Sequence, residues 1–185
     1  MREIEYREAI REAITEEMDR DGKVFLIGED IGIYNGAFKA YKGLLDKYGA
    51  DRVIDTPISE NTIIGAGIGA ALTGYRPVAE IMFVDFAALA MDQIINQASK
   101  INFLTGGSVD VPLVIRTQGG VGRGLGAQHS QSLEALFYHI PGLKLAVPST
   151  SYDVKGLLKT AIRDNSPVIF MEHKMIYPVR SPVPE

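Results

Sequence analysis

Short apolar runs separated by longer helical patterns are the feature that most limits how this chain can fold. Parallel strands need crossover connections of about a dozen residues or more, usually containing a helix. The alternation therefore predicts an α/β fold, a three-layer sandwich with a mostly parallel sheet and helices on both faces. We expect strands at 23–27, 52–54, 76–83, 111–116, 143–147 and 167–171 and helices at 6–18, 38–48, 59–73, 85–104, 129–139 and 149–163.

The composition is that of a soluble globular protein. The 185 residues are 46% hydrophobic and 23% charged, enough to bury a real core. The net charge of -4 gives no reason to expect nucleic acid or an anionic membrane as a partner. Because there is no cysteine, disulfides, thiolate metal sites and cysteine nucleophiles are excluded. The charged first eight residues form no apolar signal segment and no apolar run approaches the ~20 residues of a membrane span, so we expect a cytoplasmic protein.

The end of the chain lacks the periodicity of the rest. Residues 177–185 contain three prolines and no repeating apolar pattern. Proline-rich segments of this kind are typical of semi-rigid linkers. We therefore expect one domain at 1–176 and the start of a linker at 177–185, leading to a C-terminal domain that this sequence does not contain.

One carboxylate stands where a strand gives way to a helix. Pro57 cannot donate to a strand ladder and biases Thr56 away from helical angles, so the strand should end there. Ser59 has the residue type of a helix N-cap, which puts Glu60 in the first helical turn. The ordinary interpretation is that Glu60 complements the helix dipole. Because ligands of such sheets bind at the carboxyl ends of the strands, Glu60 is also a candidate site residue.

The helix expected at 59–73 is unusually rich in glycine. Gly65, Gly67 and Gly69 lie in its interior, where each glycine weakens a helix by roughly 1 kcal/mol relative to alanine. They indicate close approach by another backbone, a neighbouring helix or a flat ligand. Tight packing within the domain and contact with another subunit both remain open.

A second glycine-rich stretch follows the strand expected at 111–116. Gly122, Gly124 and Ala127 fit a loose dinucleotide-binding fingerprint with alanine in the last position. That fingerprint requires a helix at once and an acidic residue about 20 positions later, whereas the next strand here ends in Val-Pro-Ser. A flexible or ligand-covering loop fits better, and a dinucleotide-dependent oxidoreductase is the weaker alternative.

Two ring-bearing residues lie in segments that follow predicted strands, at the starts of the helices expected at 85–104 and 129–139. His129 is a candidate general acid or base because imidazole titrates near neutral pH, although a solvated or capping role is the ordinary interpretation. Phe86 offers a stacking face for a ring, although a core position is the ordinary interpretation. No second histidine or acid follows His129 at metal-ligand spacing, and no serine triad can be read from the sequence.

Five segments together resemble a known family. They are Thr-Pro-Ile-Ser-Glu at 56–60, Asp-Gln-Ile-Ile-Asn at 92–96, Gln-His-Ser-Gln-Ser at 128–132, Pro-Gly-Leu-Lys at 141–144 and Ala-Ile-Arg-Asp at 161–164. In this order they resemble the β subunit of thiamine-diphosphate-dependent 2-oxo acid dehydrogenases. The resemblance covers nearly the whole chain and implies a transketolase-like, pyrimidine-binding domain.

The resemblance also implies roles for particular residues. Glu60 would hydrogen-bond the ring nitrogen of the cofactor's aminopyrimidine and so promote formation of the ylid, and His129 would handle protons or orient the acyl intermediate. The cofactor-binding residues would be Glu60, Ile58, Phe86 and Gln128. A structural monovalent cation, K⁺ in some relatives, would lie near Leu113, Ala161, Ile162, Asp164 and Ser166.

Partners and substrate follow from the same resemblance. The family's Gly-Asp-Gly and asparagine motif for Mg²⁺ and diphosphate is absent here, which implies that an α subunit supplies it in a heterotetramer. The expected reaction cleaves pyruvate or acetoin and passes the two-carbon acyl unit to a lipoyl arm on an acyltransferase core. The Gln128-His129 pair resembles both pyruvate- and acetoin-cleaving relatives, and 172–174 with 182–185 lean toward acetoin. A non-catalytic binding or regulatory module of the same fold is the other alternative.

Overall fold

A six-stranded parallel sheet forms the centre of the molecule. The computed structural model describes residues 1–184. The strand order is β3-β2-β4-β5-β7-β6, and every neighbouring pair is parallel. These strands are β2 (Val24–Glu29), β3 (Val53–Thr56), β4 (Arg76–Ile81), β5 (Val114–Gly119), β6 (Lys144–Ala146) and β7 (Val168–His173). The predicted parallel α/β fold is confirmed.

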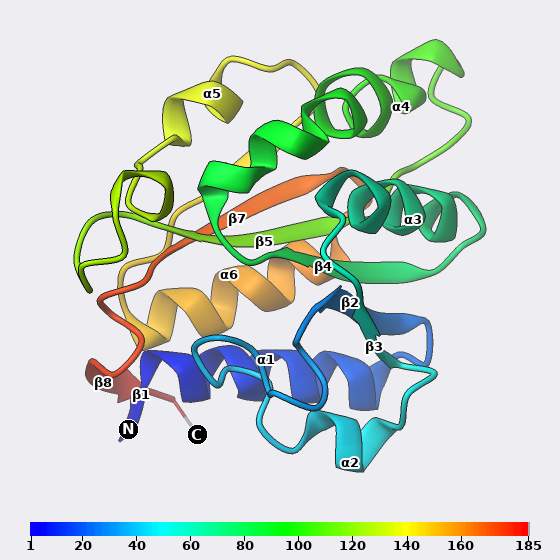
Figure 1. The fold of residues 1–185 in the computed structure, drawn as a ribbon. Coiled ribbons are helices and arrows are strands. Elements are labelled where there is room, and N and C mark those ends of the chain that lie inside the picture. The colour runs from blue at the N-terminus through cyan, green and yellow to red at the C-terminus, as the bar shows by residue number, and fades with distance from the viewer. Residues whose placement is uncertain (185) are drawn as a thin grey trace.

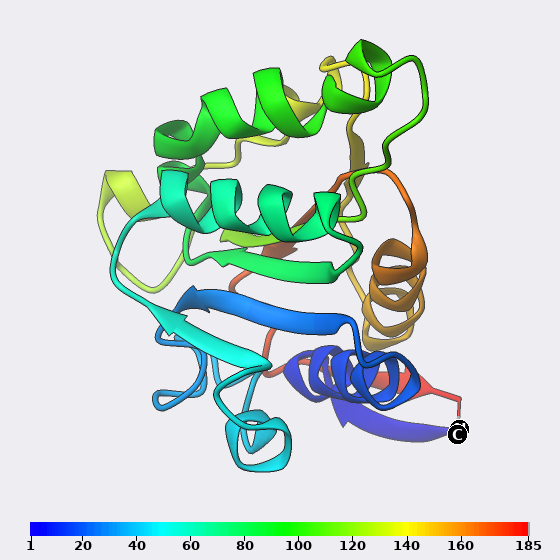
Figure 2. The ribbon, with the colours of Figure 1, turned by 90° about the vertical axis from the view of Figure 1, so that its right-hand side faces the viewer.

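Helices cover both faces of the sheet, as Figures 1 and 2 show. The long helices α1 and α6 pack against each other on one face, and α3 lies with the helical segment 84–104 on the other. The helices are α1 (Tyr6–Arg20), α2 (Leu44–Tyr48), α3 (Glu60–Leu72), α4 (Ile101–Leu104), α5 (Glu134–Tyr138) and α6 (Ser151–Arg163), with short helical segments η1 (Val84–Ala90), η2 (Gln93–Ala98) and η3 (Ala127–His129). The predicted three-layer arrangement is therefore confirmed. Within residues 1–184, none of these helices has the length and apolar character that a membrane crossing needs.

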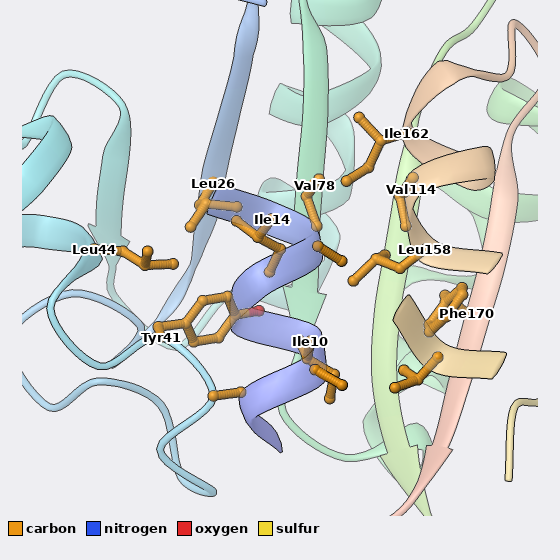
Figure 3. Close-up of a cluster of buried hydrophobic side chains, with 14 of the residues drawn as sticks. Ile10, Ile14, Leu26, Tyr41, Leu44, Val78, Val114, Leu158, Ile162 and Phe170 are labelled. Carbon is orange, nitrogen blue, oxygen red and sulfur yellow. The ribbon is translucent and has the colours of Figure 1, made fainter. Parts of the chain in front are cut away.

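The apolar periodicity of α1 builds one half of the core. Ile10 and Ile14 point from this helix toward the sheet, where they meet apolar side chains of β2, β4 and β5 and of α6 (Figure 3). Both isoleucines are fully buried. Complete burial of such a side chain stabilises a fold by about 1.5–3 kcal/mol. The predicted helix 6–18 thus forms because its apolar stripe has a sheet to cover.

A separate two-stranded sheet joins the two ends of the described chain. β1 (Arg2–Glu5) pairs antiparallel with β8 (Arg180–Val183). Ile4 and Val183 are buried, as is Tyr177, whose ring stacks on Phe38. The segment in which we expected the start of a linker is therefore packed against the domain up to β8. The proposed division at residue 176 and the further domain stay predictions.

The prediction of a helix at 38–48 is wrong over its first half. Only Leu44–Tyr48 is helical, and the residues before it form turns. Lys39 and Gly43 have φ angles of 62° and 80°, which a right-handed helix cannot contain. The turns bring Phe38 and Tyr41 into the core. Burial of these two rings outweighs the helical pattern of the local sequence.

The helix expected at 85–104 is present but irregular. It begins as the 3₁₀ segment η1, continues through the π-helical η2 and ends as the short helix α4. Ser99 Oγ donates to the Ile95 carbonyl at 2.6 Å, and Ser99 N–H donates to the Ile94 carbonyl, five residues back. The wider π-helical turn changes which side chains face α3. The apolar periodicity of the sequence alone does not reveal this turn.

The three glycines of α3 have different surroundings. A Cβ on Gly67 would lie 3.1 Å from the Leu113 side chain, and one on Gly65 would lie 3.5 Å from Gln93 in η2. Close approach is therefore confirmed at Gly67, whereas the contact at Gly65 is an ordinary van der Waals distance. Nothing lies within 4 Å of a Cβ on Gly69, so this glycine is not required by packing inside the described domain.

An ion-pair seam joins α1 to α6. The carboxylate of Glu17 has no exposed surface and accepts hydrogen bonds from Arg163 at 2.6 and 2.9 Å and from Arg20 at 2.8 Å. Burial by itself would raise the pKa of Glu17, but the bonds from Arg163 and Arg20 outweigh it and hold the pKa below its ordinary value. Because the folded-state pKa is depressed, this stabilisation is present above the unfolded pKa and is lost as the pH falls through the folded value.

We expect Glu17→Gln to lower the free energy of unfolding by about 1–2 kcal/mol at pH 7, since two arginines lose a charged acceptor. The difference from the unchanged protein should shrink as the pH falls below the ordinary glutamate pKa of about 4.3, and it should disappear once Glu17 is protonated in the folded state as well. Urea unfolding across this pH range measures it, with the exposed Glu3→Gln as the control. A difference that grows on acidification would contradict the sign of the shift.

Candidate active site

The carboxyl edge of the sheet gathers the residues singled out in the sequence. The chain passes from β2 outward to β3 and then back to β4 on the other side of β2, which makes a switch point of the kind where α/β folds bind ligands. Figure 2 shows that the start of α3 and the loop with η3 lie at the same end of the sheet. Glu60, Phe86 and His129 are all in segments that follow strands at this edge.

Glu60 begins α3 and is 7% exposed. Within residues 1–184 its carboxylate has no hydrogen-bond or ion-pair partner. Ser59 is at the N-cap position as expected, but its hydroxyl donates to Thr62 Oγ1 at 2.7 Å rather than capping a backbone amide. The helix start therefore holds a nearly buried carboxylate whose hydrogen-bonding capacity is unused by this chain, and such a group suits a donor on a ligand.

A second carboxylate lies close to Glu60. Glu29 is the last residue of β2 and is partly buried. Burial raises the pKa of Glu29 above its ordinary value, and the negative charges of Asp30 and Glu60 raise it further. The site is therefore acidic on the side of β2 and α3.

Aromatic rings enclose His129. Its imidazole lies edge to face with Phe83 at 4.8 Å and with Phe86 at 5.1 Å between ring centroids. Phe83 and Phe86 are themselves edge to face at 6.3 Å. The structure thus brings together Phe86 and His129, which the helical segments η2 and α4 and the strand β5 separate in the sequence.

Buried polar atoms without a partner are concentrated at the same edge. Within residues 1–184, every buried side-chain polar atom that lacks a hydrogen bond lies in β3, in β5 or in a segment that follows β4 or β5. They are Thr56 Oγ1, Asp85 Oδ2, Thr117 Oγ1, Gln118 Oε1 and His129 Nδ1. Buried polar groups are normally satisfied, so this clustering is typical of a site that receives hydrogen bonds from outside the chain.

A buried charge network joins strands β4, β5 and β7 near this edge. Arg116 donates to both oxygens of Glu172 at 2.6 and 2.7 Å and to Glu80 at 3.0 Å. The Tyr41 hydroxyl donates to Glu80 at 2.5 Å, and Gln118 Nε2 donates to the same carboxylate oxygen at 3.2 Å. Burial raises the pKa of Glu80, and the positive charge of Arg116 opposes this only in part. The network fixes the ends of β4, β5 and β7 relative to one another.

The other expected cofactor residues lie at the surface. Ile58 is 74% exposed, in the turn before α3, and Gln128 is exposed within η3. Inside the described part of the chain Gln128 makes no side-chain hydrogen bond. Their positions beside Glu60 and His129 agree with the expectation, while their roles stay predictions.

The residues of the expected cation site lie together at the opposite edge of the sheet. The carbonyl oxygens of Ile162 and Asp164 each accept a bond from Arg76 at 3.1 Å. The Asp164 carboxylate accepts from Ser166 N–H at 2.8 Å and from Lys144 at 2.5 Å. Two further carbonyls are used within the fold: Leu113 accepts from Val168 N–H, and Ala161 accepts from Asp164 N–H. Because two cationic side chains already contact this set, the structure gives no independent support for K⁺, and its binding stays a prediction.

The glycine-rich loop does not have the form that a dinucleotide site requires. Gly120, Gly122, Gly124 and Gly126 all have positive φ, as does Arg123. Ala127 opens only the three-residue η3, not the long helix on whose N-terminus a pyrophosphate rests. The geometry therefore weighs against the dinucleotide alternative.

Three residues contribute to the site although the sequence predicted no such role for them. Phe83 forms one wall around His129, Asp85 accepts hydrogen bonds from Gln131 N–H and Nε2, and Lys174 donates to the His129 carbonyl. Phe83 and Lys174 lie at the ends of apolar strands, where core packing is the usual role. Only the alternation Phe170, Glu172, Lys174 signals that one face of β7 carries buried charge.

Residues 2–180 match the family described as transketolase, pyrimidine binding domain. The chain belongs to this family. Among solved structures, "Split gene transketolase, inactive beta4 tetramer" superimposes with a TM-score of 0.74 and 23% identity, covering 98% of this chain and 53% of the other. That similarity agrees with the fold.

Relatives with higher identity carry a more particular name. The chain is 53% identical to "Pyruvate dehydrogenase E1 component subunit beta" of Gracilaria tenuistipitata var. liui, covering 100% of this chain and 57% of the relative. It is 50% identical to the mitochondrial subunit beta-1 of Oryza sativa subsp. japonica (98% and 49% covered) and 51% identical to the chloroplastic subunit beta-3 of Arabidopsis thaliana (96% and 44% covered). The chain thus spans about half the length of these relatives. Because two of them are organellar, a cytoplasmic location stays a prediction.

The loop that carries His129 packs closely on residues 173–175, which gives a matched pair of variants. A Cβ on Gly120 would lie 2.2 Å from His173 Nε2, whereas a Cβ on Gly124 would meet nothing within 4 Å. Both glycines have positive φ, so both alanine variants should lose about 1–2 kcal/mol to backbone strain. We expect Gly120→Ala to cost at least about 1 kcal/mol more, measured by urea unfolding. Equal losses of unfolding free energy in the two variants would contradict this, because they would show that the loop moves away from His173 at no cost.

Proposed function

We propose that this chain supplies the aminopyrimidine half of a thiamine diphosphate site in the decarboxylating component of a 2-oxo acid dehydrogenase complex. The observation that carries the proposal is the nearly buried carboxylate of Glu60, which starts a helix at the switch point and has no partner within residues 1–184. Family membership and the names of the relatives support the same reading.

The residues at this edge fit the proposed cofactor. Glu60 offers an acceptor for a ring nitrogen, and Phe86 offers an aromatic face beside it. The unpaired atoms at Thr56, Gln118 and His129 offer further hydrogen bonds. Bound thiamine diphosphate supplies a carbon nucleophile for attack on the substrate carbonyl. The diphosphate and Mg²⁺ would be held by a partner α subunit, in the heterotetramer implied by the sequence.

Each residue then has a defined task. Glu60 holds the aminopyrimidine and shares a proton with its ring nitrogen, which requires a group that can carry negative charge. Phe86 and the neighbouring Phe83 keep water from one side of the site and set the position of the His129 ring. His129 would move a proton at the substrate oxygen or orient the acyl group. The acyl unit would be transferred to the disulfide of a lipoyl arm on an acyltransferase core.

The substrate we favour is pyruvate, because the relatives are named pyruvate dehydrogenase subunits. Acetoin stays the alternative that residues 172–174 suggest. A non-catalytic module of the same fold has no use for an ionised Glu60, so a substitution that preserves shape but removes charge separates it from the enzyme.

Glu60→Gln in the assembled enzyme should lower kcat by about 100-fold or more, since the amide cannot share the proton. The free energy of unfolding should change by less than about 1 kcal/mol, because the carboxylate interacts mainly with the helix dipole in this chain. Steady-state assays with pyruvate and acetoin, alongside urea unfolding, measure both. Near-normal turnover would remove the catalytic role, and the exposed Glu3→Gln is the control.

The 185-residue chain alone should bind thiamine diphosphate weakly or not at all, with or without Mg²⁺, because it presents the residues for only one half of the cofactor. Isothermal titration against the isolated, monodisperse chain measures this. Addition of a protein that carries the Gly-Asp-Gly and asparagine motif should restore tight, Mg²⁺-dependent binding. Tight binding by the isolated chain would be incompatible with a shared site.

A further inference from the structure

Lys174 follows β7 directly and is completely buried. Glu172, two residues earlier, faces the same side of the strand and is bound by Arg116 and by the Tyr177 hydroxyl. The Lys174 ammonium reaches away from this network toward the carboxyl edge, 6.0 Å from the centroid of the Phe83 ring. A buried ammonium is costly unless specific bonds hold it, so its contacts indicate what it does.

These contacts join the two ends of the glycine-rich loop. The backbone N–H of Lys174 donates to the Gly119 carbonyl at 3.1 Å, where the loop begins. Its side-chain ammonium donates to the His129 carbonyl, where the loop ends. A single residue therefore spans the loop 119–129 at its base.

Further contacts hold the same base. Gly120 N–H donates to the Gln131 carbonyl at 2.8 Å, and Asp85 Oδ1 accepts from Gln131 N–H at 3.2 Å and Nε2 at 2.9 Å. Between these points the loop is largely exposed and has five residues with positive φ. The loop is thus fixed at its base by hydrogen bonds, while its middle packs on Met175 at Gly122 and on the Phe38 ring through Arg123.

The bonds of Lys174 to Gly119 and His129, which we call the clamp, bear on the orientation of the His129 ring. A functional histidine is commonly oriented by a hydrogen bond to one ring nitrogen. Here Nδ1 is buried and has no partner within residues 1–184. Among the described residues, the ring is held only by its two edge-to-face aromatic contacts and by the backbone that carries it. That backbone is held by the bond from Lys174 to the His129 carbonyl, by the bond from His129 N–H to the Gly126 carbonyl, and by the contacts of Gln131.

We propose that Lys174 is a positioning residue for His129, closing the glycine-rich loop so that the imidazole stays between Phe83 and Phe86. The expected effect on turnover rests on the proposed function. The positioning of the His129 ring by Lys174 does not depend on it. A misplacement of about 1 Å in a catalytic group can cost about 100-fold in rate. Loss of this clamp therefore acts on turnover rather than on cofactor binding, since Lys174 is on the side of His129 and not of Glu60.

Lys174→Met keeps the length and burial of the side chain and removes the ammonium. In NMR spectra of the 185-residue chain, the His129 ring protons should lose the ring-current shifts caused by Phe83 and Phe86. The control is Lys159→Met, which removes a lysine of α6 that pairs with Glu16 of α1. This variant should leave those resonances unchanged. In the unchanged protein we expect a nuclear Overhauser contact between the Lys174 side chain and His129, a readout that does not depend on whether the variant folds.

In the assembled enzyme, Lys174→Met should lower kcat about 10- to 100-fold while the KM for thiamine diphosphate stays within about twofold. Unchanged His129 ring resonances in Lys174→Met, or no Lys174–His129 contact in the unchanged protein, would overturn the inference whatever the activity. If His129→Ala keeps full turnover while the Lys174→Met resonances move, the proposed role of His129 fails but the clamp stands. The two failures are thereby distinguished.

Discussion

The guanidinium of Arg116 is the interaction on which the architecture of the site depends. It lies in the central part of the sheet, has no exposed surface, and joins β4 through Glu80 to β7 through Glu172. Tyr41 and Tyr177 bring the loop after β2 and the C-terminal segment to the same point. Removing one partner of such a network would leave an uncompensated buried charge, commonly at a cost of about 3–5 kcal/mol. The network therefore sets the register of the strands whose ends carry the site.

From this point a line of polar side chains leads to the carboxyl edge. Gln118 and Lys174 lie two residues beyond Arg116 and Glu172 on the same faces of β5 and β7. Gln118 donates back to Glu80, whereas Lys174 donates forward to the loop that carries His129. The buried centre of the domain is thus connected to an exposed loop through buried groups, which is how a loop residue can be held in place.

The proposed cofactor site would account for the polar groups that this domain leaves unpaired. Here the carboxylate of Glu60 and the buried atoms at Thr56, Gln118 and His129 have no partner within residues 1–184. Unsatisfied buried groups destabilise a folded domain, so their retention at one edge is consistent with partners brought by a ligand and another subunit.

The sequence by itself determined the layered α/β fold, because the alternation of buried strands and amphipathic helices leaves few other ways to bury the apolar surface. It also led to the prediction of Glu60, Phe86 and His129 as site residues, since each follows a strand and matches a family pattern, and the structure places all three at the carboxyl edge. The sequence did not determine the turns at 38–43, the irregular helix 84–104 or the pairing of β1 with β8, where long-range packing outweighs local preference. Only the tertiary structure placed Lys174 beneath His129, because that contact joins residues 45 positions apart and has no local signal.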